Sequence, residues 1–341
     1  MARRGVDHRG RAFDEETHTV KTLRLGSRGS QLALFQARLV AERIQSAGGP
    51  ACDIVVIKTS GDRLQEAPLS EIGGKRLFVK EIEDALISRD IDVAVHSSKD
   101  MPAVLPDGLE VGAVLEREDP RDALVLPSRQ QAKGQSVAYS GESPESAPRV
   151  GTGSVRRIAQ LRRRFPAAEF LNVRGNLDTR LRKLDAGDYD LLVLAAAGLR
   201  RLGFGARISV SLSIEECVPA PGQGIIAIEI RADDAEARLA VARVNNHDAS
   251  SALEAERALV TALGGGCQMP IGGIAAVTAD GQDLELNAVV ASLDGTRVIR
   301  YKKVAVRTEA ATLGRDVADE LLEQGAADIL KQGAAVRIPN S

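Results

Sequence analysis

Short apolar runs alternate with amphipathic helical segments along the first hundred residues. Residues 22–25, 53–58 and 92–96 are typical of strands, and the segments 30–44 and 77–88 between them carry apolar residues at helical spacing. Strands that alternate with helices in this way run parallel, because each helix returns the chain to the same edge of the sheet. The pattern therefore predicts an α/β fold with a parallel sheet and helices on its faces. In the first helix we expect Ser30 as N-cap and a buried face formed by Leu32, Phe35, Leu39, Val40 and Ile44.

A second unit of the same kind is expected after residues 130–148, a stretch rich in Ser, Gly, Gln and Pro that is typical of an exposed insertion. Its expected elements are a strand near Val150, a helix over 154–165, a strand over 169–173, a helix from Asn176 to Asp185 and a strand over 190–194. The rest of the chain predicts a strand over 225–230, helices over 233–245 and 249–263, strands over 273–278, 283–291 and 297–305, and one helix over about 311–332. That order indicates a small α+β domain at the C-terminal end.

Charge is unevenly distributed, although the net charge is only −2. Residues 149–201 contain 11 Arg and one Lys against five Asp and Glu, which indicates that an anionic ligand binds locally. Aromatic residues make up 3% of the chain and Trp is absent, which argues against a stacking platform for single-stranded nucleic acid.

The three cysteines, Cys52, Cys217 and Cys267, are too few and too widely spaced for a disulfide framework or a zinc site. No segment stays apolar over the roughly 18 residues that a membrane crossing needs. Residues 1–20 lack the apolar core of a secretory signal. We therefore expect a cytoplasmic protein that binds no metal, with a disordered extension over residues 1–20.

Arginines follow the predicted strands or begin the predicted helices at four places: Arg28, the pair Arg156 and Arg157, Arg174, and Arg180. Helix N-termini favour anions, and a guanidinium group adds bidentate binding of a carboxylate or phosphate. Because ligands of open α/β sheets collect at the carboxyl ends of strands, these arginines are predicted to face one cleft. For any one of them alone, a solvated surface charge is the simpler explanation.

Cys267 lies in the run LGGGCQMPIG, where three glycines leave the thiol unshielded on a tight loop. A cysteine presented in this way is typical of an attachment point or a nucleophile, whereas a packed cysteine usually lies inside an apolar helix or strand. Glycine-rich loops with an idle cysteine also occur, so the spacing alone leaves both interpretations open.

Polar residues also follow the predicted strand over 92–96. Lys99 and Asp100 are expected to project from the edge of the sheet, where a carboxylate can stabilise a cation and hold an N–H donor. A lone histidine in a buried strand is more often a core residue than a catalytic base, and we expect the same of His96. The glycine-containing loop over 60–76 is either a lid over the cleft or an ordinary surface loop.

Nine stretches together resemble the porphobilinogen deaminase (hydroxymethylbilane synthase) family, in the family's order from about residue 22 to about residue 272. They are LRLGSRGSQLAL, GGKRLFVKEIEDAL, DVAVHSSKDMP, EREDPRDA, VGTGSVRRIAQL, RGNLDTRLRKL, LAAAGLRRLG, PAPGQGIIAIE and GGGCQMPIG. The resemblance implies an α/β fold of three domains, of which the first two resemble the lobes of type II periplasmic binding proteins and the third is a small α+β domain. The implied boundaries are 21–116 with 218–240 for domain 1, 117–217 for domain 2 and 241–341 for domain 3.

The resemblance also implies a transferase of tetrapyrrole biosynthesis. A dipyrromethane cofactor would be attached to Cys267 through a thioether, four porphobilinogen molecules would be condensed onto it with loss of ammonia, and hydrolysis would release linear hydroxymethylbilane. Asp100 matches the catalytic carboxylate, which also binds pyrrole N–H groups. The other implied cofactor contacts are Lys99, Thr152, Ser154, Arg156, Arg157 and Arg180. The implied substrate contacts are Arg28, Ser30, Gln36 and Arg174, and Lys75 and Phe78 match a mobile loop over the cleft.

Two positions depart from the family pattern, because Gly153 stands where Ser is common and Ser98 stands where a larger apolar residue is frequent. A carboxylate-binding protein with the same two lobes would need the arginines but neither Cys267 nor Asp100, and it would normally be exported. Net acidity and few aromatic residues argue against an arginine-driven nucleic-acid binder. We expect a monomeric enzyme that binds porphobilinogen and neither nucleic acid nor a membrane.

Overall fold

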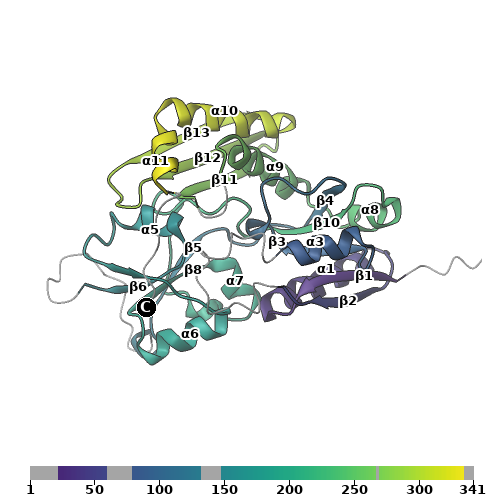
Figure 1. Cartoon of the computed structure of the whole chain (residues 1–341), viewed down its shortest axis with the longest axis horizontal. Helices are drawn as coiled ribbons and strands as arrows, with labels where there is room; N and C mark the ends of the chain where they lie inside the picture. The colour runs from purple at the N-terminus through teal and green to yellow at the C-terminus, as the bar shows by residue number, and fades with distance from the viewer. Residues whose placement is uncertain (1–21, 60–78, 132–146, 266–268, 334–341) are drawn as a thin grey trace, which may run out of the picture.

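Three β-sheets organise the part of the chain that the computed structural model describes, which is residues 22–59, 79–131, 147–265 and 269–333 (Figure 1). The first and second sheets have five strands each, and the third has three. We call the first sheet with its helices the first lobe, the second sheet with its helices the second lobe, and the third sheet with its helices the third unit. In the view of Figure 1 the third unit, in green and yellow, lies above the two lobes.

The sheet of the first lobe has the strand order β2-β1-β3-β10-β4. Its strands are β1 (Leu23–Arg28), β2 (Cys52–Ile57), β3 (Val93–Ser97), β4 (Leu109–Val114) and β10 (Ile226–Arg231). Its helices are α1 (Gln31–Ser46), α3 (Lys80–Ile87) and α8 (Ala235–Ala242). β1 is parallel to β2 and β3, whereas β10 is antiparallel to both of its neighbours, and every residue of β10 is buried.

Helix α1 begins where the sequence predicts, because the Ser30 side chain accepts a hydrogen bond from the Ala33 N–H at 3.3 Å. The predicted buried face is confirmed only in part, because Leu32 and Leu39 are half-buried. Val40 and Ile44 are fully buried together with Ala37, but Phe35 is 36% exposed. Successive helical residues are about 100° apart around the axis, so Phe35 points away from the buried face that Ala37, Val40 and Ile44 form.

The sheet of the second lobe has the order β7-β6-β8-β5-β9. Its strands are β5 (Asp122–Val125), β6 (Arg149–Gly151), β7 (Glu169–Leu171), β8 (Leu191–Ala195) and β9 (Val210–Ser211). Its helices are α4 (Ser128–Gln131), α5 (Val155–Leu161), α6 (Leu177–Ala186) and α7 (Ala196–Arg201). β6 is parallel to β7 and β8, and β5 is antiparallel to β8.

Both lobes therefore share one topology. In the first, β1 lies between β2 and β3, and antiparallel β10 follows β3; in the second, β6 lies between β7 and β8, and antiparallel β5 follows β8. This is the two-lobed architecture that the resemblance to type II periplasmic binding proteins implies. The expectation of a purely parallel sheet is wrong for β5 and β10. Each of these strands enters its sheet from the other lobe and not through a returning helix, so nothing constrains it to run parallel.

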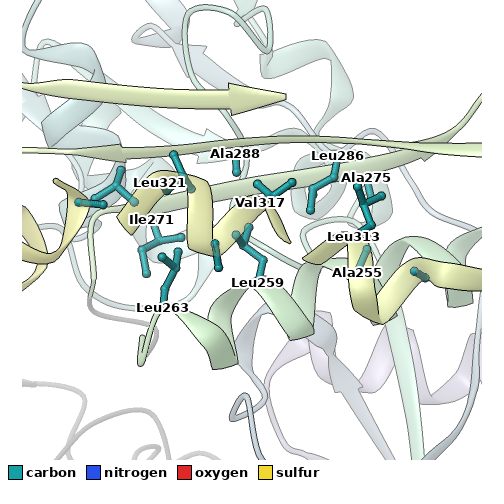
Figure 2. Packing of buried hydrophobic residues seen from close by; sticks show 14 of the residues in the cluster. Ala255, Leu259, Leu263, Ile271, Ala275, Leu286, Ala288, Leu313, Val317 and Leu321 are labelled. Carbon is teal, nitrogen blue, oxygen red and sulfur yellow. The ribbon is translucent and has the colours of Figure 1, made fainter. Parts of the chain in front are cut away.

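The third unit is an antiparallel sheet covered by helices, as the sequence predicts. Its strands are β11 (Ile271–Val277), β12 (Asp283–Ala291) and β13 (Val298–Val306), and its helices are α9 (His247–Ala262), α10 (Ala310–Glu323) and α11 (Ala326–Gly333). Figure 2 shows Leu259 of α9 and Val317 of α10 pointing into the core that these helices form with the sheet. The single helix expected over 311–332 is wrong, because Gly325 adopts the left-handed conformation with φ of 93° and ends α10.

Two crossover segments, residues 115–121 and 212–225, join the lobes. They lie side by side: the Glu118 N–H donates to the Gly224 carbonyl at 3.1 Å, and the Arg117 Nε donates to the Gln223 carbonyl at 2.9 Å. Arg117 also binds Glu256 of α9 through both nitrogens of its fork, at 2.7 and 3.0 Å. The crossovers are thereby attached to the third unit as well. Among the described residues, none of the helices combines the length and the apolar character that a membrane crossing requires.

Candidate active site

A cavity of about 820 Å³ lies between the two lobes, and the third unit contributes part of its wall. The structure brings most of the predicted site residues together around it. Those that line it are Arg28, Ser30, Gln36, Lys99, Asp100, Ser154, Arg156, Arg157, Arg174 and Arg180. The expectation that the four arginine positions face one cleft is therefore confirmed.

Other predicted site residues are placed differently. Thr152 is fully buried and is not among the lining residues; its hydroxyl accepts a hydrogen bond from the Ser154 N–H at 3.3 Å. Cys267, Lys75 and Phe78 lie outside the described residues, as do the N-terminal extension and residues 132–146 of the expected insertion, whose first residues Gln130 and Gln131 end helix α4. Gly265 and Met269, the described residues on either side of Cys267, both line the cavity.

On the side of the first lobe, the end of β3 positions the polar residues. The strand ends at Ser97, and a 3₁₀ turn over Ser98–Asp100 closes with the Met101 N–H donating to the Ser98 carbonyl at 3.1 Å. The turn directs Lys99 and Asp100 to the cavity wall. Gln36 of α1 is buried and exchanges hydrogen bonds with the Ser97 hydroxyl at 2.9 and 3.0 Å, which anchors the helix to this turn.

On the side of the second lobe, Arg156 and Arg157 share one buried carboxylate. Asp122, the first residue of β5, accepts from Arg156 Nη1 at 2.7 Å and from Arg157 Nη2 and Nε at 2.7 and 3.0 Å. Burial raises the pKa of Asp122, but the charges of Arg156 and Arg157 outweigh this effect and hold the pKa far below its usual range. The two arginines are thus fixed in place by a permanently ionised partner, and the site keeps an excess of positive charge.

Arg180 is a cation of the cavity wall whose surroundings disfavour its charge. Its Nε donates to the Gly175 carbonyl at 2.8 Å, which holds the side chain against the turn before α6. Burial and then the charge of Arg157 lower the pKa of Arg180 to about 10, while the charge of Asp100 opposes this shift. A guanidinium in such a position is stabilised by an added anion, so this part of the cavity is suited to a carboxylate.

Sequence reasoning missed three residues of the site. Asp122 and Gln223 lie in the quoted stretches EREDPRDA and PAPGQGIIAIE, but nothing in the spacing links them to arginines far along the chain. Arg201 lines the cavity, donates to the Gly224 carbonyl at 2.6 Å, and has its pKa lowered to about 10 by burial. Arg201 is the last residue of α7, so a rule that selects arginines directly after strands or at helix starts does not find it, although it lies in the quoted stretch LAAAGLRRLG.

His96 is a core histidine, as expected. It is buried, it is not among the residues that line the cavity, and its Nε2 lies 3.0 Å from a carboxylate oxygen of buried Glu229 on β10. The described residues contain no cluster of three or more His, Cys, Asp or Glu arranged to hold a metal ion. The charged groups that line the cavity are several guanidinium groups, the Lys99 ammonium group and the carboxylates of Asp100 and Asp178.

Two family models match the chain. One, described as porphobilinogen deaminase, dipyromethane cofactor binding domain, matches residues 23–239, and the other, described as porphobilinogen deaminase, C-terminal domain, matches residues 251–323. A protein named porphobilinogen deaminase from Syntrophobacter fumaroxidans is 46% identical over 315 residues, which is 92% of this chain and 98% of that protein. A protein of the same name from Acidithiobacillus ferrooxidans is 45% identical over 311 residues, which is 91% of this chain and 97% of that protein.

Solved structures give weaker likenesses. The periplasmic VFT2 domain of Bordetella pertussis BvgS is 15% identical, with a TM-score of 0.37 over 65% of this chain and 86% of that domain. An ancestral cationic amino acid solute binding protein is 16% identical, with a TM-score of 0.37 over 66% of this chain and 87% of that protein. The shared strand order of the two lobes establishes the architecture without these likenesses.

Proposed function

Since the chain belongs to the porphobilinogen deaminase family, we propose that the cavity between its lobes condenses four porphobilinogen molecules onto a dipyrromethane cofactor held by Cys267, and then releases hydroxymethylbilane. The family membership itself makes the chain a transferase of tetrapyrrole biosynthesis with a dipyrromethane cofactor. The observation that carries the proposal is the convergence of the arginines, Lys99 and Asp100 on one cavity.

The residues present fit the cofactor. Each pyrrole ring bears an acetate and a propionate group, so the bound chain is a polyanion whose rings also present N–H donors. Arg180 is half-buried, its pKa is lowered, and a carboxylate placed beside it would stabilise its charge. Asp100 on the opposite wall supplies the acceptor that pyrrole N–H groups need. When bound, the cofactor supplies the terminal ring to which the next unit is joined.

Asp100 is the residue that we assign to catalysis. Porphobilinogen would lose ammonia from its aminomethyl group, and the cofactor would supply the ring carbon that takes up the resulting methylene group and gives up one proton. A fixed carboxylate lowers the energy of the positive charge that develops as ammonia leaves. The aminomethyl nitrogen must be in its ammonium form for ammonia to leave, so Asp100 is also our candidate for the proton transfer.

The binding roles divide between the walls of the cavity. We assign Arg28, Ser30, Gln36 and Arg174 to the incoming substrate. We assign Lys99, Ser154, Arg156, Arg157 and Arg180 to the cofactor, with Thr152 acting through its hydrogen bond to Ser154. Lys75 and Phe78 are assigned to a loop that covers the cleft. We further propose domain 1 over 21–116 with 218–240, domain 2 over 117–217 and domain 3 over 241–341, in a monomeric cytoplasmic enzyme that binds no nucleic acid.

Intact mass spectrometry of the purified protein tests the proposal. The wild-type mass should exceed the sequence mass by one dipyrromethane, and porphobilinogen should add further rings in discrete steps. Cys267→Ser should abolish the increment, whereas the control Cys52→Ser should keep it, because Cys52 lies at the start of β2 and is not among the residues that line the cavity. An increment that persists in Cys267→Ser would place the attachment elsewhere, and an unmodified wild type that ignores porphobilinogen would contradict the function.

A further inference from the structure

Gln223 lies on the second crossover and its side chain contacts residues of both lobes. It is 1% exposed, and it lines the cavity. Its side-chain oxygen accepts a hydrogen bond from Lys99 Nζ of the first lobe at 3.2 Å. Its side-chain nitrogen donates to Asp122 Oδ1 of the second lobe at 3.0 Å and to the Pro120 carbonyl at 2.6 Å. The partners fix the orientation of the amide, because Lys99 offers only donors while Asp122 and Pro120 offer only acceptors.

The backbone on either side of Gln223 is held tightly. Gly222 has φ of 75°, and a Cβ there would lie 2.6 Å from the Ser98 hydroxyl oxygen. Gly224 has φ of 89°, and a Cβ there would lie 2.3 Å from the Glu118 carbonyl oxygen. The second crossover therefore packs closely against the turn that carries Lys99 on one side and against the first crossover on the other. The amide is held in position by its own backbone and does not adapt freely to its partners.

A continuous set of hydrogen bonds follows from these contacts. It runs from Lys99 through Gln223 to Asp122, and from Asp122 to Arg156 and Arg157. The cation of one wall is thereby connected to the paired cations of the opposite wall through two intervening side chains.

The neutrality of the amide matters for this connection. A carboxylate at position 223 would form an ion pair with Lys99 and would lie about 3 Å from the Asp122 carboxylate, a distance at which two such groups cannot both ionise without a large cost. An amide instead accepts from Lys99 without cancelling its charge, and it gives Asp122 a further donor. Glutamine therefore hydrogen-bonds to both neighbours without adding a charge between them.

We infer that Gln223 is a positioning residue that sets the location of the Lys99 ammonium group relative to the Arg156–Arg157 pair, and so sets the span over which the carboxylates of the cofactor are held. This inference rests on the proposed function, since it takes Lys99 and the arginines as the groups that hold the acidic side chains of the rings. Gln223 does not act on the reacting atoms itself.

The first test compares Gln223→Leu with Gln160→Leu. Gln160 is also a buried amide bound to the second crossover, through the Val218 N–H at 2.8 Å and the Val218 carbonyl at 3.1 Å, but it lies outside the set that joins Lys99 to Asp122. Both variants should lose thermal stability to a similar extent. Gln223→Leu should in addition lower kcat/KM by about 10- to 100-fold, the usual effect of misplacing one charged hydrogen-bonding group. Gln160→Leu should stay within about threefold of the wild type. Equal activity losses in the two variants would show that activity follows stability alone and would overturn the inference.

Gln223→Glu gives a second readout that does not depend on comparing stabilities. A protonated glutamic acid resembles glutamine, because its hydroxyl donates to Asp122 and its carbonyl accepts from Lys99; the ionised form loses the first interaction and neutralises Lys99. The ratio of variant to wild-type kcat/KM should therefore increase as the pH is lowered from about 9 to about 6. In parallel, the distribution of ring-addition states after a limiting dose of porphobilinogen should shift toward fewer additions at the higher pH, as seen by intact mass. A flat ratio across this range would overturn the inference.

The wild type measured in the same series separates the two hypotheses. If the wild type carries no dipyrromethane and adds no rings, the proposed function fails. If the wild type adds rings normally and Gln223→Leu and Gln223→Glu do so with unchanged kcat/KM, the proposed function stands and the role of Gln223 is refuted.

Discussion

Replacing Asp122 with asparagine should be among the most damaging conservative changes in the second lobe. Asp122 is fully buried, and it accepts hydrogen bonds from two buried arginines and from Gln223. Asparagine keeps the shape but removes the charge, which leaves Arg156 and Arg157 in the interior without a counter-ion. Breaking a buried ion pair from one side typically costs about 3–5 kcal/mol. We therefore expect Asp122→Asn to lower the free energy of unfolding by about 4 kcal/mol.

Asp190→Asn provides a matched control. Asp190 also accepts several hydrogen bonds from one arginine, Arg149, but its side chain is 33% exposed and that of Arg149 is 41% exposed. Exposed ion pairs contribute about 0–1 kcal/mol, so this variant should lose no more than about 1 kcal/mol. Urea denaturation followed by circular dichroism measures both, since the chain has no Trp. Equal losses in the two variants would refute the view that burial makes the Asp122 interaction large.

The pH dependence of this difference follows from the direction of the pKa shift. Folding depresses the pKa of Asp122, so its stabilising contribution is fully present above the unfolded value of about 3.9 and is lost as the pH falls through the folded value. The difference between wild type and Asp122→Asn should therefore stay constant from about pH 8 to about pH 5 and should shrink only below about pH 4. A difference that already declines near neutral pH would contradict the ionised state assigned to Asp122.

Two further outcomes test the catalytic assignment and the packing of the third unit. Asp100→Ala should keep the mass increment of the cofactor but lose nearly all turnover, as measured by hydroxymethylbilane formation; turnover close to that of the wild type would remove Asp100 from the mechanism. Gly314→Ala should lower the free energy of unfolding by about 1–3 kcal/mol, because its Cβ would lie 2.3 Å from the Ala255 carbonyl oxygen of α9. Gly281→Ala is the control, because a Cβ at position 281 would meet nothing within 4 Å. Gly281 has φ of 75°, so any stability lost in this variant comes from backbone strain and not from a steric clash.

The sequence was sufficient for the features that depend on local pattern. Strand β1 and helix α1 follow from alternating periodicity and from the Ser30 cap, and the arginines converge because residues after parallel strands emerge at one edge of a sheet. The break between α10 and α11 depends on the backbone conformation of Gly325. An amphipathic pattern that continues on both sides of a glycine does not reveal that conformation.

Long-range partners could not be predicted from the sequence. Asp122 lies 34 residues from Arg156, and in the sequence nothing distinguishes it from the other acidic residues of the stretch EREDPRDA. Its role depends on β5 entering the second sheet from the first lobe, and the local periodicity of the sequence does not indicate that connection. Gln223 is similar, because its importance comes from two crossovers that run side by side.

The position of β10 has a consequence for how a nascent chain acquires its structure. β10 fills the place between β3 and β4 in the first sheet, yet it is made only after the whole second lobe. Until the ribosome has released Ile226–Arg231, one side of β3 is an open edge of unpaired amide groups. All five strands of the second lobe are synthesised before β10, so the second lobe is able to fold while the first lobe still lacks β10. Chaperone demand during synthesis should therefore be concentrated on the N-terminal part of this protein.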